Sequence, residues 1–162
     1  MATIVIFVVV MLLVGSVFWI MPSGRQRQQM RIRERALAAG VRVKMYPLEL
    51  PRAPGELPQP KRLILMYSVA REQKSVQPEW QLHRAAGLEP FDLAPGWVWK
   101  KLPSQDAVLD LHSIANIVNV LPKSVDGVIS TPLECALYWN EKNEQELDAI
   151  AQSLDSLKRL TS

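Results

Sequence analysis

Residues 4–21 form an unbroken apolar stretch near the start of the chain, IVIFVVVMLLVGSVFWIM, with no charge among its eighteen positions. As a helix it extends roughly 27 Å at about 1.5 Å per residue, close to the hydrocarbon thickness of a bilayer. A helix satisfies its own backbone hydrogen bonds in lipid, so the many β-branched residues do not exclude it. The sequence therefore predicts a transmembrane anchor over residues 1–21. A helix buried in a globular domain is the alternative, although such helices normally carry some polar residues.

Basic residues follow this stretch and none precede it. The next segment contains a cluster of five arginines: Arg25, Arg27, Arg31, Arg33 and Arg35. Because Arg and Lys beside a span remain on the cytoplasmic side, the cluster predicts a bacterial-type inner (plasma) membrane protein, with its N-terminus outside and its C-terminal domain cytoplasmic. A cleaved signal peptide would instead need positive charge before the apolar stretch. The single cysteine, Cys135, agrees with a reducing compartment.

Trp19 and the arginine cluster are the predicted membrane-proximal residues. Trp19 lies near the end of the apolar stretch, where aromatic side chains favour the membrane–water interface. Each basic residue near an anionic leaflet contributes about 1 kcal/mol, so anionic lipid headgroups are candidate ligands of the cluster. A solvated helix that only fixes topology is the other interpretation.

The formal net charge of +3 is unevenly distributed along the chain. Residues 1–46 carry seven Lys and Arg against one acid, whereas residues 47–162 carry twelve against fifteen. A nucleic-acid-binding domain is expected to present a basic face. The distal part of the chain is mildly acidic, and no nucleic acid partner is predicted.

Residues 22–46 are expected to form a basic juxtamembrane helix and a strand. Residues 25–39 are mostly good helix formers, with Gly40 suited to the position after the helix, and residues 41–46 alternate apolar and basic side chains as a half-buried strand does. Residues 47–60 contain five prolines and predict a linker or an extended loop. Pro51 and Pro54 have the spacing of a PxxP ligand, which is a further alternative.

The layout of residues 1–46 resembles the translocon accessory subunit YajC. The similar features are one span, Pro22, the arginine cluster and the spacing of Leu37, Gly40 and Val43. The resemblance covers about a quarter of the chain and departs from the family where Val41 follows Gly40. It therefore indicates a shared style of anchor and not kinship.

Residues 61–162 predict a small cytoplasmic α+β domain, a sheet with helices packed on one face. Apolar runs and alternation indicate strands at 62–70, 97–101, 125–130 and 133–139. Helices are expected at 78–86, at 105–121 with Ser104 as cap, and after Asn143, where Glu146 completes a capping box. With the strand at 41–46 the order is β-β-α-β-α-β-β-α.

No catalytic, cofactor or metal signature is present in the sequence. The histidines and the cysteine are not at metal-ligand spacing, and neither a Walker loop nor a GxGxxG motif occurs. No catalytic residue, cofactor or metal is therefore predicted. The candidates for an enzymatic alternative are Cys135 with a histidine, His83 or His112, and the carboxylate pairs Glu134/Glu141 and Asp106/Asp110.

The favoured function is a non-enzymatic, single-span accessory or assembly subunit of an inner-membrane complex, whose cytoplasmic domain binds another protein. Trp97 and Trp99 share one strand face and are either core residues or a recognition surface. Gly15 and Ser16 would let a second helix approach the span closely. The alternatives are a membrane-tethered enzyme, using Cys135 or a carboxylate pair, and an envelope module that binds anionic lipid.

Overall fold

The computed structural model describes residues 2–20, 23–48, 61–84, 90–104 and 109–160, together with Gly55 and Leu57. Within the first helix, side chains are described at positions 2–13 and 15. The predicted proline-rich segment 47–60 therefore lies largely outside the described residues. Asp106 and the side chains of Ser16 and Trp19 lie outside them as well.

The apolar stretch forms helix α1 (Ala2–Ile20), but the prediction of a transmembrane anchor over residues 1–21 is wrong. Nowhere in the described part of the chain does a helix combine the length and the apolar character needed to cross a bilayer. This finding does not fit the predicted single-pass protein of an inner membrane.

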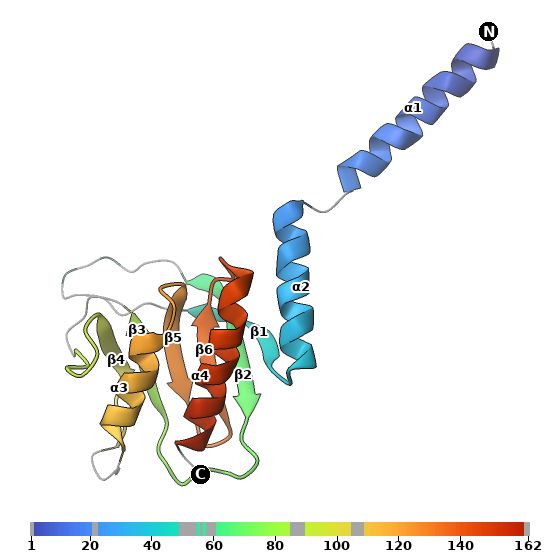
Figure 1. The fold of residues 1–162 in the computed structure, drawn as a ribbon. Coiled ribbons are helices and arrows are strands. Elements are labelled where there is room, and N and C mark those ends of the chain that lie inside the picture. Colours follow the sequence, from blue (N-terminus) through green and yellow to red (C-terminus); the bar gives the residue numbers. More distant parts are fainter. Residues whose placement is uncertain are drawn as a thin grey trace.

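Six antiparallel strands form one sheet in the order β1-β2-β6-β5-β3-β4 (Figure 1). The central strand β6 is buried along most of its length, because it pairs with β2 and β5 and its side chains enter the buried clusters on both faces of the sheet. β1 and β4 stand at the two ends of this order. The strands are β1 (Arg42–Leu48), β2 (Arg62–Ala70), β3 (Trp80–Arg84), β4 (Trp97–Lys101), β5 (Val125–Ser130) and β6 (Glu134–Trp139).

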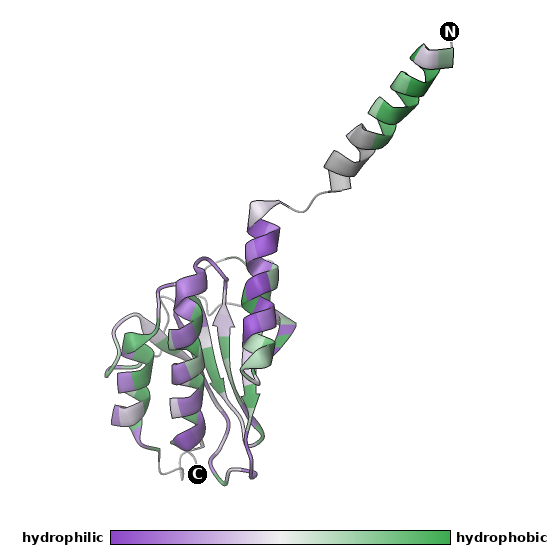
Figure 2. Ribbon diagram, turned by 45° about the vertical axis from the view of Figure 1, so that its right-hand side comes forward, coloured by the Kyte–Doolittle hydropathy of each residue, from purple (hydrophilic) through white to green (hydrophobic). Residues whose placement is uncertain are grey.

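Three helices cover one face of the sheet: α2 (Gly24–Ala38), α3 (Leu111–Val120) and α4 (Leu147–Arg159), which follows the short helix η1 (Glu144–Glu146). Their apolar sides meet the sheet, and their hydrophilic sides face outward (Figure 2). The main core lies between these layers and includes Ile32 of α2, Ile114 of α3 and Ile150 of α4. The molecule is thus a small α+β domain, and this part of the predicted fold class agrees with the structure.

The helix predicted at residues 78–86 is wrong, because residues 80–84 form β3. Trp80 and Leu82 point into the core below the helices, whereas Gln81 and His83 point to the opposite face. Hydrogen bonding to β4 on one side and β5 on the other stabilises the strand. Tertiary pairing outweighs the local preference suggested by Pro78 at a helical first turn.

The helix predicted at 105–121 is shorter in the structure. α3 begins at Leu111, and the Asp110 carboxylate caps it by accepting a hydrogen bond from the Ser113 N–H at 3.0 Å. Asp110 therefore replaces Ser104 as the observed cap of this helix. Residues 105–108 lie outside the described part of the chain.

The basic segment that precedes the proline-rich stretch belongs to the sheet domain. β1 pairs with β2 over seven residues, from Arg42 opposite Ser68 to Leu48 opposite Arg62. α2 places Ile32 and Ala36 in the main core with no exposed surface. Burial of this kind is worth about 25 cal/mol per Å² of apolar area, so α2 is a structural layer and not only a connector.

Candidate interaction surface

α2 begins with a capping box that the sequence determines locally. The Gln26 N–H donates to the Ser23 hydroxyl at 3.3 Å, and the Ser23 N–H donates to the Gln26 side-chain oxygen at 2.8 Å. These two bonds satisfy backbone donors that the first turn of a helix leaves without partners. The helix is therefore formed up to Ser23.

A buried carboxylate holds α2 against the sheet. The Arg33 Nε donates to Glu141 Oε1 at 2.8 Å and its Nη2 to Oε2 at 2.9 Å, and the Tyr67 hydroxyl donates to Oε1 at 2.5 Å. The Glu141 side chain is fully buried, whereas the side chain of Arg33 remains 42% exposed. Hydrogen bonding to Glu141 raises the pKa of Arg33, and burial, followed by the Glu141 bond, raises the pKa of Tyr67. We call this group the Arg33–Glu141–Tyr67 network.

Glu141 occupies an uncommon backbone conformation, with φ of 52° in the left-handed region. Non-glycine residues adopt this region rarely, at a cost of about 1 kcal/mol or more. The bidentate bond to Arg33 and the Tyr67 hydroxyl hold the carboxylate where this conformation places it. The network therefore fixes both α2 and the turn after β6.

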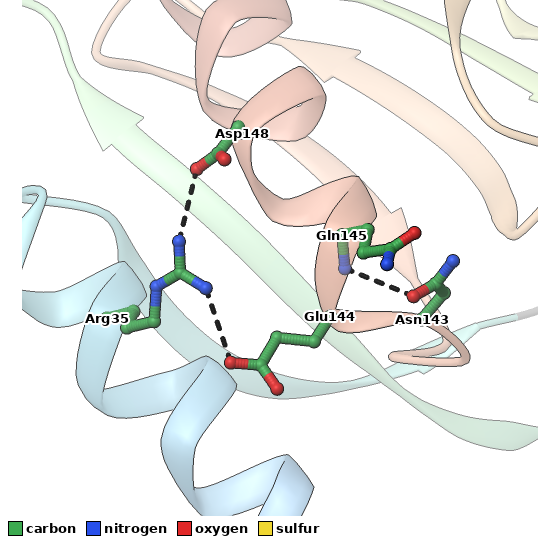
Figure 3. Close-up of polar contacts among 5 residues, drawn as sticks. All are labelled: Arg35, Asn143, Glu144, Gln145 and Asp148. Carbon is green, nitrogen blue, oxygen red and sulfur yellow. Dashed lines mark hydrogen bonds and ion pairs between the residues drawn. The ribbon is translucent and has the colours of Figure 1, made fainter.

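A second ion pair joins α2 to the start of α4. In Figure 3 the Arg35 guanidinium lies between two acids, 3.2 Å from Glu144 Oε1 and 3.5 Å from Asp148 Oδ1. The Asn143 side chain accepts from the Gln145 N–H at 3.1 Å and so begins η1 beside this pair. Because Arg35 and Asp148 are more than half exposed, each contact stabilises the domain by well under about 1 kcal/mol.

The predicted arginine cluster is thus divided by the structure. Arg33 and Arg35 contact acids of the same chain, whereas Arg25, Arg27 and Arg31 remain exposed. Basic residues of β1 extend the exposed set. Four of these exposed residues form no ion pair with the acids described in the structure: Arg25, Arg31, Arg42 and Lys44.

Apolar side chains of the same two elements, α2 and β1, are also exposed. Met45 of β1 is 66% exposed, and Met30 and Leu37 of α2 are 48% and 61% exposed. At 100° per residue, Met30 and Leu37 lie on one side of α2, away from Arg35 and its contacts with the start of α4. We call this set the α2–β1 surface: Arg25, Arg27, Met30, Arg31, Leu37, Arg42, Lys44 and Met45.

The other predicted partner-binding residues lie elsewhere. Trp97 is only 2% exposed, with the Arg84 guanidinium 4.6 Å from its ring centroid. Trp99 is half-buried and packs edge-on against Phe91, at 5.1 Å between ring centroids. Both tryptophans lie on the helix-covered face. Their role as partner contacts stays a prediction, and of the two only Trp99 has a side chain that a partner can reach.

Gly15 and Ser16 also stay predictions. Gly15 is exposed in α1, and a Cβ added there would meet no described atom within 4 Å. The Ser16 side chain lies outside the described residues.

The residues proposed for the enzymatic alternative that the structure describes are buried, paired with other side chains, or exposed singly. Cys135 is fully buried in the main core, and burial raises the pKa of its thiol. Glu141 is held in the ion-pair network, and Asp110 caps α3. His112 is exposed on α3. Within the described residues, no three His, Cys, Asp or Glu side chains gather closely enough to hold a metal ion.

We expect Cys135→Ala to lower the free energy of unfolding by about 1–2 kcal/mol, because it leaves a small cavity in a filled core. The native thiol should react with a maleimide only when the protein unfolds, since the thiolate is the reactive form and burial disfavours it. Labelling rates measured with and without urea check this. Rapid labelling of the native protein, or loss of cellular function at unchanged abundance, would instead favour a catalytic Cys135.

Sequence reasoning missed a buried polar cluster on the face of the sheet opposite the helices. His83 and Tyr138 meet edge-on with ring centroids 5.7 Å apart, and Tyr46 lies 5.7 Å from Tyr138 on its other side. A Cβ on Gly127 would come within 2.8 Å of the Tyr138 ring, so glycine is needed for this packing. The alternation of residues 80–84 was the signal that could have placed His83 here.

His83 is fully buried, and neither ring nitrogen has a hydrogen-bond partner among the described residues. Burial, and secondarily the charge of Lys100, lowers its pKa to about 4. The imidazole is therefore neutral near pH 7, and protonating it would place a positive charge in an apolar site. Protonation of His83 is therefore expected to lower the stability of the folded protein.

A pocket of about 590 Å³ lies between the loop after β2 and the end of α4. Most of its charged residues form hydrogen bonds or ion pairs with other residues of the same chain. Arg71 donates to the backbone oxygens of Thr131 and Lys158 at 2.9 and 3.1 Å, and it therefore joins β2, the β5–β6 turn and α4. Lys158 pairs with Glu72 at 2.7 Å and Arg159 with Asp155 at 2.6 Å.

No protein-family model, curated protein or solved structure matches this chain. The resemblance of residues 1–46 to YajC gains no support from a family match.

Proposed function

We propose that this chain is a non-enzymatic protein-binding domain that acts as an accessory or assembly subunit of a larger complex. The observation that carries the proposal is the α2–β1 surface. It combines exposed positive charges, exposed Met and Leu side chains and an edge strand. Exposed apolar side chains gathered beside polar ones are typical of protein interaction sites.

The rigidity of α2 supports the same proposal. Ile32 and Ala36 are buried, and the Arg33–Glu141–Tyr67 network clamps the middle of the helix. A surface held in one conformation loses less entropy when a partner binds. Methionine side chains such as Met30 and Met45 adapt to the shape of a partner, which suits an assembly subunit.

An anionic-lipid module is less well supported than a protein-binding domain. The exposed arginines suit anionic headgroups, but an open strand edge offers backbone pairing that a protein segment uses and a headgroup does not. The enzymatic alternative is also less well supported, because Cys135 is buried and Glu141 is occupied by Arg33 and Tyr67.

Site-specific photo-crosslinking in cells tests the proposed function. With the crosslinking amino acid at position 45 we expect one discrete protein adduct, and Arg42→Glu with Lys44→Glu should reduce it strongly. The matched control is position 120 on α3, because Val120 is an exposed apolar residue, 73% exposed, on a different element. Equal or diffuse adducts from both positions would contradict the proposal.

A further inference from the structure

The outer edge of β1 is open in the described structure. β1 pairs with β2 on one side, and it is the first strand of the sheet order. Met45 and Tyr46, in the middle of the strand, are 66% and 45% exposed. An edge strand presents backbone N–H and C=O groups that another extended chain can pair with.

Pro47 indicates which backbone groups point outward. It has no N–H, so its pair with Leu63 is expected to be a non-hydrogen-bonded pair of the antiparallel ladder. Alternate residues of a strand point their backbone groups to opposite edges. The N–H and C=O groups of Val43 and Met45, which share this parity, are therefore directed away from β2.

The side chains of β1 sort into two kinds by the same alternation. Val43 belongs with the helix-covered core, so Met45, two residues on, lies on that same face of the sheet. Arg42 and Lys44 lie on the opposite face. An added strand would therefore meet Met45 on one face, and on the other the positive charges of Arg42 and Lys44 beside the half-exposed Tyr46.

These charges also decide which chain can pair there. A second copy would bring its own Arg42 and Lys44 against those of the first, and like charges across strands are destabilising. Lys and Pro on an edge strand are a known means of preventing self-pairing. Acidic side chains on the incoming strand would instead be attracted to Arg42 and Lys44. The exposed Arg25, Arg27 and Arg31 of α2 add to the attraction of an acidic segment.

We propose that the edge of β1 binds an extended segment of a partner protein in which acidic and apolar residues alternate, and that this segment adds a seventh strand to the sheet. The inference rests on the proposed function and deepens it by naming the chemistry of the partner. The acidic residues would face Arg42 and Lys44, and the apolar residues would face Met45 on the helix-covered side of the sheet.

Synthetic seven-residue peptides test the inference on the full chain. The probe alternates Glu and Val. A block peptide of the same composition, with its Glu and Val residues grouped, controls for charge, and an alternating peptide N-methylated at every second amide controls for strand pairing. We expect only the unmodified alternating peptide to bind with shifts of the Val43 and Met45 amide signals in NMR spectra.

Protein variants give a second measurement. Arg42→Glu with Lys44→Glu should weaken binding of the alternating peptide by about tenfold, because two exposed charge contacts are lost. Met45→Pro should abolish binding, whereas Met45→Ala should weaken it less, since only the proline removes an outward N–H. Unchanged β2 and β6 amide signals identify a variant whose sheet is intact, and the peptide controls require no variant.

Binding of the block peptide, the N-methylated peptide or inorganic polyphosphate as tightly as the alternating peptide would overturn the inference, because only net charge would then matter. Concentration-dependent dimerisation through β1 would overturn it in favour of a second copy. If the peptides fail while position 45 still crosslinks one protein in cells, the strand-addition inference fails and the proposed function stands. If both experiments fail, both proposals are wrong.

Discussion

Replacing Glu141 with Gln is expected to lower the free energy of unfolding by about 2–3 kcal/mol. The substitution keeps the size of the side chain and an acceptor for the Tyr67 hydroxyl, but it removes the charge that the bidentate bonds from Arg33 require. Breaking a fully buried pair costs about 3–5 kcal/mol. The expected loss lies at the low end of this range or below it, because Arg33 is 42% exposed and its guanidinium is hydrated by water when Glu141 is replaced.

The same substitution should loosen α2 before the rest of the sheet. Hydrogen exchange at the amides of residues 28–37 should become faster, since the clamp on that helix is gone. Glu144→Gln is the matched control, because its contact with Arg35 is more exposed and should cost under about 0.5 kcal/mol. A double-mutant cycle with Arg33→Leu measures the coupling. Equal stability of Glu141→Gln and Glu144→Gln in urea unfolding would contradict this account of the network.

Local patterns predicted most of the sheet, because its strands carry their own signals. The strands predicted at 62–70, 125–130 and 133–139 and the alternation at 41–46 correspond to β2, β5, β6 and β1. β3 was not predicted, because Pro78 is typical of the first turn of a helix and residues 78–86 were therefore assigned to a helix. Only the pairing of residues 80–84 with β4 and β5 shows that they are extended.

The candidate site was less predictable because it depends on contacts between distant residues. The five arginines look alike in the sequence, yet Arg33 and Arg35 meet acids more than a hundred positions away. No local pattern indicates that Glu141 is buried or that α2 packs on the sheet. The charge density of residues 25–44 was recognised, but its interpretation as a membrane-proximal segment depended on the anchor, which the described structure does not support.

Acidification from pH 7 to pH 4 is expected to destabilise the protein through His83. Its pKa is about 4 in the folded protein and about 6.5 in an unfolded chain, so the unfolded state binds the proton first as the pH falls. The contribution of His83 to stability is therefore complete above about pH 6.5 and declines steadily down to about pH 4. At about 1.4 kcal/mol per pH unit the loss reaches about 2 kcal/mol at pH 5 and about 3 kcal/mol at pH 4.

His83→Phe should remove this dependence, because the ring keeps its edge-on contact with Tyr138 but cannot take up a proton. Urea unfolding at pH 7.5 and pH 5.0 should show the variant close to wild type at the higher pH. At the lower pH it should be about 2 kcal/mol more stable than wild type. His112→Gln controls for loss of an exposed histidine and should keep the wild-type slope. Parallel pH profiles for His83→Phe and wild type would show that His83 is not the group that titrates, and exposed carboxylates such as Asp110, whose pKa its hydrogen bond to Ser113 lowers, would then account for the acid sensitivity.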